Sequence, residues 1–403
     1  MINPAARVQG WIEDRADEMA GLLVKLIAAN TENPPGRGLK RCAELLRSEM
    51  ERLGLACEIL PVPPAEALED PCVLRATVGT GSKLVYFHGH FDVVPAQNRS
   101  QFSAERRDGR IIGRGSADMK GGVVSMIYAA AAAKHLGLLG DGRIVIHLVC
   151  DEETGSVAGS GFLRKTGLID TSALAMLTAE PSGGSIWNAA RGAISLRVRV
   201  EGREAHVGQA ALGVNAFQQM IRLAQSLEPY AREMADKHTG FAMDGHDARG
   251  SMLVIGGLSG GGSNFNVVPG SAWFTVDGRF NPEEDLDSEL ARMKRIISEA
   301  ALSIGAKATI EVTQFQPSAS TRRDQPTGDV LARCIRSMEG ELPRFELCAG
   351  ILETRWYAQL GIPAYSYGGG SLDVSHGPRE FIDEAKMRRC AAVYALFAQE
   401  ILA

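Results

Sequence analysis

The first 190 residues of the chain alternate short apolar runs with amphipathic helical patterns. Residues 83–95 and 143–150 are rich in β-branched side chains and too short for typical helices, so each predicts a strand that is buried on both faces. Helical periodicity, interrupted by glycine and proline, predicts helices at residues 11–29, 38–53, 122–136 and 159–165. Shorter apolar segments predict strands at residues 56–62, 109–115 and 173–179. Helices that alternate with strands predict an α/β fold.

The pattern changes near residue 190. Residues 193–201 alternate polar and apolar side chains, which is typical of a strand with one solvated face. The segments that follow predict helices at residues 214–236 and 283–304 and strands near residues 251–255, 272–280 and 308–312. Together they predict a small antiparallel sheet with helices on one face. The glycine-rich stretch 256–262 between two of these strands predicts a flexible hairpin or hinge.

Helix and buried strand resume in the last part of the chain, at residues 328–338 and 362–367. We therefore expect residues 191–314 to be an α+β insertion in an α/β domain formed by residues 1–190 and 315–403. A chain of 403 residues is long enough for two domains.

Composition and charge narrow the range of partners. The hydrophobic content of 45% and charged content of 23% are typical of a globular protein in water. A net charge of -5 and a pI near 6.0 give no basic surface for nucleic acid or an anionic membrane. The expected partner is a small molecule.

The sequence predicts a cytoplasmic protein. The first residues contain no apolar stretch of signal-peptide length, and the longest apolar run, 123–133, is far shorter than a membrane span. The seven cysteines have no CxxC spacing, and their odd number favours reduced thiols.

Three adjacent acids, Asp151, Glu152 and Glu153, follow the apolar run 143–150. The carboxyl ends of strands are where open α/β sheets bind their ligands. Three neighbouring carboxylates repel one another, so a cation is expected to compensate their charge. A solvated acidic turn would account for these three residues equally well if they stood alone.

Other predicted strands also end in histidine or acidic residues. His90 and Asp92 follow one strand, Asp118 follows the segment 109–115, and Glu180 follows the strand 173–179. Imidazole and carboxylate groups suit zinc, manganese or cobalt. The spacing of His90 and Asp92 has a further reason, because a ligating imidazole commonly donates its second N–H to a carboxylate. The sequence thus predicts a metal site at one edge of the sheet.

These motifs resemble the M20 family of metallo-aminoacylases and exopeptidases. The resemblance rests on five stretches in the family's order, which are HGHFDVVP at 88–95, GRGSADMKGG at 113–122, DEETG at 151–155, AEPS at 179–182 and SHG at 375–377. It implies a three-layer α/β/α zinc-exopeptidase-like catalytic domain with an inserted ferredoxin-like dimerisation lid. It also implies two divalent metal ions, for which zinc is the first expectation and cobalt or manganese are alternatives.

The resemblance assigns a role to each matching residue. One metal would be held by His90 and Glu180, the other by Glu153 and His376, with Asp118 as the bridge. Asp92 would orient His90, and Glu152 would be the general acid/base for a water held between the metals. In family members the peptide bond after the bridging aspartate is often cis, which here is Asp118–Met119.

The resemblance extends to the inserted domain. His206, in the stretch 202–208, matches a histidine that stabilises the reaction's oxyanion, usually in the neighbouring subunit's site, which implies a homodimer. Arg279 and Asn266 match residues that bind the substrate's α-carboxylate.

The predicted substrate-binding residues in the C-terminal part are Arg355, Gly369 and Gly370. Arg355 is kept in a segment where Ile351 and Leu352 replace the family's small polar residues, so the usual acyl preference is not carried over. Gly369 and Gly370 would form a backbone cradle beside the carboxylate.

The function predicted from these residues is hydrolysis of the amide bond of an N-acyl amino acid or related small amide, of the deacetylase or desuccinylase type. A dipeptidase or glutamate-releasing carboxypeptidase is the main alternative, because the same groups would cut any suitably placed amide. Amides on ring compounds are further candidate substrates. A metal-binding scaffold without catalysis is an alternative function. The presence of Glu152 argues against the scaffold, which needs ligands but no base.

Overall fold

The computed structural model describes residues 3–63, 68–243 and 249–403. The chain forms two compact units. Unit 1 comprises Met1–Asn188, Ser320–Glu346 and Glu353–Ala403, and unit 2 comprises Ala189–Ala319 and Leu347–Leu352. The expected insertion lies within unit 2, to which the structure adds a few flanking residues and the separate segment 347–352.

The large sheet is mixed, with its central strands parallel. Its strand order is β1-β2-β6-β3-β7-β15-β8-β13, and β14 also pairs with β8. The strands are β1 Cys57–Pro61, β2 Cys72–Gly79, β3 Lys83–His90, β6 Gly142–Val149, β7 Ala175–Thr178, β8 Ile186–Ala190, β13 Ala319–Ser320, β14 Phe345–Cys348 and β15 Ala364–Ser366. Strands β6, β3, β7 and β15 are parallel neighbours, so their carboxyl ends meet at one edge.

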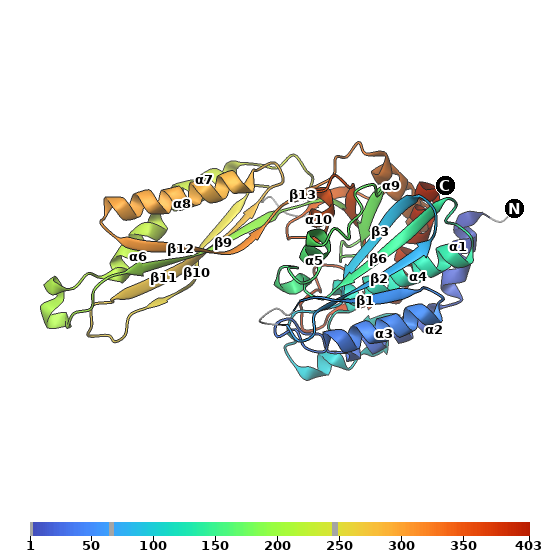
Figure 1. Ribbon diagram of the computed structural model, residues 1–403, viewed down its shortest axis with the longest axis horizontal. Helices are drawn as coiled ribbons and strands as arrows, with labels where there is room; N and C mark the ends of the chain where they lie inside the picture. The colour runs from blue at the N-terminus through green and yellow to red at the C-terminus, as the bar shows by residue number, and fades with distance from the viewer. Residues whose placement is uncertain (1–2, 64–67, 244–248) are drawn as a thin grey trace. The chain divides into compact units, whose positions relative to one another are not determined.

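Helices cover both faces of this sheet (Figure 1). Val85 and Phe87 of β3 pack into the larger core, and Leu84 and Tyr86 face the smaller one. The larger core is built with α1 Pro4–Glu13, α2 Ala16–Ala28, α3 Leu39–Arg52, α4 Gly121–His135, α9 Pro326–Glu339 and α11 Glu384–Leu402, and the smaller with α5 Ser160–Lys165 and α10 Thr354–Ala358. This three-layer α/β/α arrangement confirms the expected fold class.

Tight packing brings α4 to the edge where the strands end. A Cβ at Gly122 would lie 2.3 Å from Ala179 O, so only glycine allows this approach. Beside it lies a small sheet in the order β16-β5-β4, formed by β4 Glu105–Arg107, β5 Arg110–Ile112 and β16 Phe381–Asp383.

Unit 2 is a four-stranded antiparallel sheet with helices on one face (Figure 1). Its order is β10-β11-β9-β12, with β9 Gly192–Glu201, β10 Met252–Gly261, β11 Ser271–Phe280 and β12 Lys307–Gln316. Alternate apolar residues of β9, from Ile194 to Val200, are buried under α6 Ala216–Ser226, α7 Glu228–Asp236 and α8 Leu286–Ser303. The α+β architecture expected from the alternation at 193–201 is therefore observed.

Several elements differ from the expectation. The helix expected at 214–236 is two helices, because Pro229 in the first turn of α7 has no N–H to continue α6. The helix expected at 11–29 is also divided, between α1 and α2. The stretch 256–262 is not a hinge: β10 continues past a bulge, and Ser259 pairs with Phe274. Strands β2 and β8 were not expected.

None of the helices in residues 3–63, 68–243 and 249–403 is both long and apolar enough to cross a membrane. All seven cysteines are free thiols, and six of them are buried.

Candidate metal centre and active site

The candidate metal ligands lie at the carboxyl edge of the large sheet. His90 is the last residue of β3, and Glu180 lies two residues beyond the end of β7. Glu153 lies in a short 3-10 turn after β6, and Asp118 lies in the irregular turn that leads into α4. His376 lies in a loop before β16 and has a positive φ of 61°. Five separate segments of unit 1 thus deliver imidazole and carboxylate groups to one place.

These side chains form two groups that share Asp118. His90 Nε2 lies 3.3 Å from Asp118 Oδ1 and 3.8 Å from Glu180 Oε1. His376 Nε2 lies 3.3 Å from Asp118 Oδ2 and 3.6 Å from Glu153 Oε1. Within each group the candidate ligand atoms all lie within 4.8 Å of one another. Because each oxygen of Asp118 faces a different histidine, this carboxylate is placed to bridge two cations.

The donor set fits two divalent metal ions. Each group offers one imidazole nitrogen and carboxylate oxygens, the mixture that zinc and neighbouring transition metals accept. Glu180 Oε1 is buried and has no hydrogen-bond partner among the described residues, which is costly for a carboxylate unless a cation binds there. The residues present therefore suit the two metals that the sequence predicts.

Asp92 holds the His90 side of the site. His90 Nδ1 lies 3.0 Å from the Asp92 carbonyl oxygen, so a neutral ring that donates there presents its Nε2 lone pair to the metal position. The Asp92 carboxylate accepts hydrogen bonds from the N–H groups of Glu152 and Glu153, at 3.2 and 3.1 Å, and from Asn33 Nδ2 at 3.0 Å. Asp92 thus ties His90 to the turn that carries both glutamates.

A buried ion pair holds Asp118 and His376. Glu380 Oε1 accepts hydrogen bonds from the N–H groups of Ala117 and Asp118, both at 3.0 Å. Glu380 Oε2 pairs with Arg114 Nη1 at 2.7 Å, and Arg114 Nη2 donates to His376 O at 3.3 Å. The Asp118–Met119 peptide bond is cis, as the resemblance implies. One ion pair therefore contacts the backbone of two candidate ligands.

Sequence reasoning did not find Arg114, Glu380 or Asn33. Arg114 and Glu380 lie 266 residues apart in the chain, so no local spacing connects them. Arg114 does lie inside the matched stretch 113–122, which is the one signal that marks it.

The crowded charges shift the pKa values of these groups. Burial raises the pKa of Glu180 to about 7, and hydrogen bonds to Asp118 and Glu153 raise that of His376 to about 10. Burial raises the pKa of Glu153 as well. Burial opposes ionisation of Asp118, but its hydrogen bonds to His376 and His90 lower its pKa below the usual range. Without bound cations the cluster therefore retains protons that cations would displace.

Glu152 lies beside the ligands but belongs to neither group. Its carboxylate makes no hydrogen bond within the described ranges, whereas its N–H is held by Asp92. Burial raises the pKa of Glu152 well above its ordinary value, and the nearby Glu153 and Glu180 charges raise it further, while His90 lowers it. An uncommitted carboxyl group with a raised pKa is suited to exchange protons near neutral pH.

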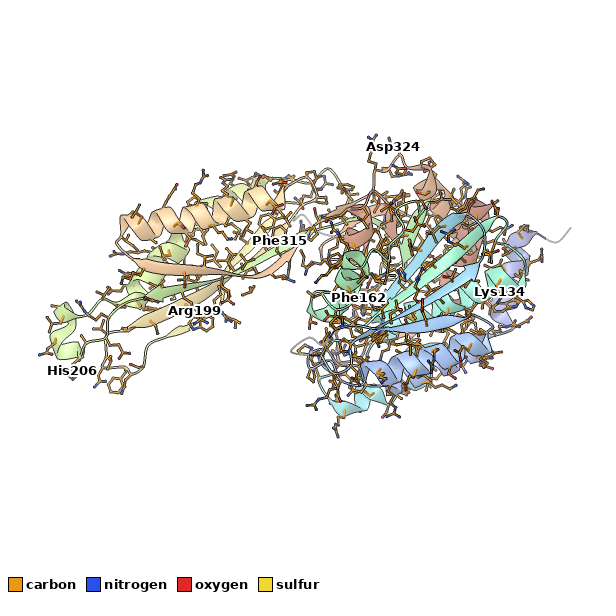
Figure 2. All side chains as sticks on the ribbon, viewed as in Figure 1. Lys134, Phe162, Arg199, His206, Phe315 and Asp324 are labelled. Carbon is orange, nitrogen blue, oxygen red and sulfur yellow. The ribbon has the colours of Figure 1, made fainter. Side chains whose placement is uncertain are left out.

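The predicted residues of unit 2 fall at two ends of its sheet. His206 and Asn266 lie together at one end, where Val207 N donates to Asn266 O at 2.9 Å and the exposed His206 ring accepts from Gly208 N at 3.1 Å. Arg279 lies near the other end of β11 and pairs with Asp277 at 3.2 Å. Figure 2 labels His206 at its end of unit 2 and Phe315 toward the opposite end. Unit 2 by itself does not bring His206 and Arg279 together.

Arg355 differs from the expectation for a substrate-binding residue. Its side chain is 1% exposed, and its guanidinium lies 3.2 Å from Glu353 Oε1 and 3.1 Å from Ser156 Oγ. A guanidinium committed to buried groups of unit 1 is not presented to a ligand, so we assign Arg355 a supporting role.

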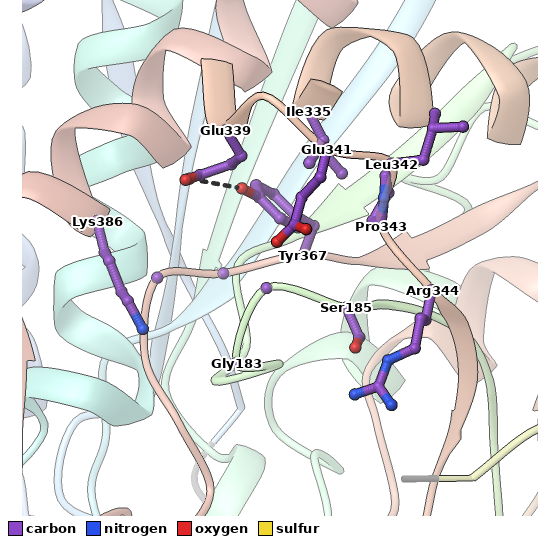
Figure 3. Close-up of a pocket in the computed structure, with 13 residues that line it drawn as sticks. Gly183, Ser185, Ile335, Glu339, Glu341, Leu342, Pro343, Arg344, Tyr367 and Lys386 are labelled. Carbon is purple, nitrogen blue, oxygen red and sulfur yellow. Dashed lines mark hydrogen bonds between the residues drawn. The ribbon is translucent and has the colours of Figure 1, made fainter. Parts of the chain in front are cut away.

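Gly369 lies on the wall of a pocket of about 380 Å³ in unit 1. Figure 3 shows this pocket with Lys386 and Arg344 among the labelled residues that line it. Lys386 and Arg344 line this pocket together with Glu339, which accepts a hydrogen bond from Tyr367 at 3.4 Å. Gly370 packs against the backbone just before Asp118, because a Cβ there would lie 2.6 Å from Ala117 O. Of the two predicted glycines, Gly369 therefore lies on this pocket and Gly370 lies against the turn that carries Asp118.

Most of the chain matches one known protein family. The sequence model of Peptidase family M20/M25/M40 matches residues 86–400. The chain belongs to this family. It is therefore a hydrolase of the M20 type that acts on amide or peptide bonds.

Two curated relatives cut different small amides. The chain is 26% identical to a succinyl-diaminopimelate desuccinylase of Parvibaculum lavamentivorans, over 85% of this chain and 87% of that protein. It is 23% identical to an N-formyl-4-amino-5-aminomethyl-2-methylpyrimidine deformylase of Halalkalibacterium halodurans, over 96% and 95%. Identities this low do not carry a substrate from either relative to this chain.

Solved structures of M20 enzymes share the fold. Human carnosine dipeptidase 1 is similar with a TM-score of 0.77 and 20% identity over 99% of both chains. The Saccharomyces cerevisiae dipeptidase Dug1p is similar with a TM-score of 0.80 and 17% identity, over 99% of this chain and 98% of that chain. The YXEP protein of Bacillus subtilis is described as a dinuclear metal-binding peptidase. It is similar with a TM-score of 0.71 and 15% identity, over 97% of this chain and 99% of that chain. The fold of this M20 chain is therefore that of the family's known enzymes.

Proposed function

We propose that this M20 hydrolase removes a small acyl group from the nitrogen of an amino acid or a related small amide in the cytoplasm, using two divalent metal ions, zinc first. The observation that carries the proposal is the pair of ligand groups joined by Asp118, with Glu152 beside them and bound to neither. A metal-binding scaffold without catalysis would need the two ligand groups but would not need Glu152. The two curated relatives, which remove succinyl and formyl groups, support the class of substrate.

Each residue of unit 1 has one task in this reaction. The metals would be held by His90, Glu180, Glu153, His376 and the shared Asp118, and Asp92 fixes the orientation of His90. Bound metals would polarise the amide carbonyl and lower the pKa of water. Glu152 accepts a proton from the attacking water and returns it to the leaving amine, a role for which its raised pKa suits it.

Unit 2 supplies the remaining groups, and the active form is a homodimer. His206 donates to the oxyanion in the neighbouring subunit's site, while Asn266 and Arg279 bind the substrate's carboxylate. Exposed apolar side chains support the dimer: Phe217 and Ile221, one turn apart on α6, are 50% and 38% exposed, and Leu212 nearby in the chain is 63% exposed. A second copy would remove this surface from water.

The test is a panel of N-acetyl, N-formyl and N-succinyl amino acids, N-formylated ring amines and dipeptides, assayed before and after chelation. We expect release of amine from one acyl class, loss of that activity on chelation and recovery with zinc, cobalt or manganese. Turnover of dipeptides alone would replace the proposal by the dipeptidase alternative, which the two dipeptidase folds also fit. Turnover that survives complete metal removal would contradict both.

A further inference from the structure

A buried polar cluster lies behind the turn that carries Glu152 and Glu153. Its centre is the carboxylate of Glu353, the residue just before α10, and its other members come from β3, from the segment after the turn and from α10. Glu353 and four of the residues that contact its carboxylate are almost completely buried, with exposures of 0% for Glu353, His88, Ser156 and Ser160 and 1% for Arg355. None of these residues belongs to a metal-ligand group or has a proton-transfer role in the proposed reaction.

Glu353 accepts hydrogen bonds through both of its carboxylate oxygens. Ser156 Oγ lies 2.5 Å from Oε1, and Arg355 Nη1 lies 3.2 Å from the same oxygen. Ser160 Oγ donates to Oε2, and His88 Nε2 lies 3.0 Å from Oε2. Burial opposes ionisation, but the Arg355 guanidinium and the hydrogen bond to His88 hold the pKa of Glu353 below its usual range. The carboxylate is therefore a charged acceptor whose bonds are strong.

Ser156 joins this cluster to the catalytic turn. Its N–H donates to Asp151 O at 2.6 Å, which closes the turn around Glu152 and Glu153. Ser156 has a positive φ of 64°, a conformation that residues other than glycine rarely adopt and that surrounding bonds must hold. Its hydroxyl lies between the Glu353 carboxylate and Arg355 Nη2. The end of the turn is thus anchored to Glu353 through the side chain of Ser156.

A second link from Glu353 runs to the strand that carries His90. The His88 ring lies between Glu353 and the hydroxyl of Tyr357, at 3.0 Å from each. His88 precedes His90 by two residues on β3. One buried carboxylate therefore contacts both the strand that presents His90 and the segment that follows Glu153.

We propose that Glu353 is a positioning residue of the active site, which holds the Glu152–Glu153 turn in register with His90. Glu353 touches neither metal nor substrate, and it acts through Ser156, Ser160 and His88. The role rests on the proposed function of Glu152 and Glu153. Residues that orient metal ligands from outside typically change metal affinity or activity about 10- to 100-fold when they are replaced.

The variant Glu353→Gln tests this role, because glutamine keeps the shape but replaces one charged acceptor oxygen by a donor. We expect faster hydrogen exchange of the backbone amides at 152–158 in the metal-free protein and metal affinity about 10- to 100-fold weaker. We also expect kcat to fall by a similar factor with little change in KM, since the substrate contacts are elsewhere. Hydrogen exchange by mass spectrometry, metal titration against a competing chelator and steady-state kinetics measure the three quantities.

Two variants serve as matched controls. Trp356→Phe removes the indole donor that lies 3.2 Å from Glu353 Oε1 but leaves both serine contacts in place. Glu346→Gln changes another buried carboxylate of unit 1, which pairs with Arg344 at 3.1 Å and, within the described part of the chain, makes no hydrogen bond to the turn. Both should leave exchange at 152–158 and metal affinity as in the unmodified protein, even if the melting temperature falls.

Unchanged exchange at 152–158 and unchanged metal affinity in Glu353→Gln would overturn the proposal, whatever the loss of thermal stability. If Glu353→Gln does not fold, Ser156→Ala decides, because it breaks the link to the turn and keeps the buried charge. It should reproduce the faster exchange, and normal exchange in that variant would also overturn the role. Exchange and metal affinity need no substrate, so they remain decisive if the substrate panel fails.

Discussion

The metal centre of unit 1 and the His206 end of unit 2 hold their functional side chains in opposite ways. In unit 1, His90 is 1% exposed and is fixed by Asp92, whose carboxylate is itself held by three donors. At the end of unit 2, His206 is exposed, and its ring accepts a hydrogen bond from the N–H of Gly208. All the candidate metal ligands lie within unit 1, whereas the oxyanion role proposed for His206 needs groups that unit 2 does not supply.

The two sites differ because metal binding and oxyanion stabilisation require different degrees of preorganisation. Metal ligands carry like charges that repel one another, so buried donors such as Arg114 and the backbone N–H groups must hold them before a cation binds. A residue that stabilises a transient oxyanion needs to be in place only when substrate is bound.

The largest effect is expected for Asp118→Asn. Both ligand groups share this carboxylate, so the loss of its charge should abolish tight binding at both metal positions and bring turnover below detection. Metal content after dialysis, measured by elemental analysis, checks the result. Asp373→Asn, an exposed acid in the loop before His376, is the matched control and should retain both metals. Retention of two metals by Asp118→Asn would contradict the bridging role.

Glu152→Gln should lower kcat by about 10²- to 10⁴-fold, the usual contribution of a general acid/base. Metal content should not change, because Glu152 belongs to neither ligand group. The combination of full metal content and lost turnover distinguishes a base from a ligand. Turnover within a few-fold of the unmodified enzyme would assign the proton transfer to another group.

His206→Ala should lower kcat by about 10²- to 10³-fold, the typical loss for one oxyanion donor, without any change in metal content. Mixing this variant with Glu152→Gln tests the neighbouring-subunit role. A mixed dimer would contain one site with both Glu152 and His206 intact, so activity should recover on mixing. No recovery, despite demonstrated subunit exchange, would place His206 in the site of its own subunit.

The last effect concerns the pH dependence of metal binding, for which all the candidate ligands lie in unit 1. Metal binding must displace protons from Glu180, with a pKa of about 7, and from His376, with a pKa of about 10. Both pKa values lie above the ordinary ones, so affinity should rise with pH through this range, by about tenfold per unit for each proton displaced. Calorimetric titration in buffers of different ionisation enthalpy counts the protons released. In His376→Ala the count of protons released on metal binding should fall by one between pH 8 and 10.

Local patterns in the sequence predicted much of this molecule. The run 83–95 contains β3 because a buried strand needs consecutive apolar residues, and the alternation at 193–201 marked β9 as half-solvated. The residues that form the two ligand groups all lie in the motifs that carry the M20 resemblance. Periodicity failed where one residue interrupts a longer pattern, as Pro229 does between α6 and α7.

The contacts of Arg355 could not be predicted from the motif that contains it. A guanidinium in a matched segment predicts a ligand for carboxylate, but the chain supplies its own carboxylate, Glu353, within the same buried cluster. The contacts of Glu353 with Ser156 and Ser160 join positions 197 and 193 residues apart. No spacing along the chain indicates such pairs, because they form only when α10 packs on the large sheet.

The sequence alone determined the α/β class and predicted the insertion and the chemical identity of the candidate ligands, because strand periodicity and ligand type are properties of neighbouring residues. The tertiary structure alone decided that each oxygen of Asp118 faces a different histidine and that the Arg114–Glu380 pair holds two ligands from behind. It also decided that His206 and Arg279 lie near opposite ends of one sheet. Those facts depend on how distant segments pack, and packing is a property of the whole chain.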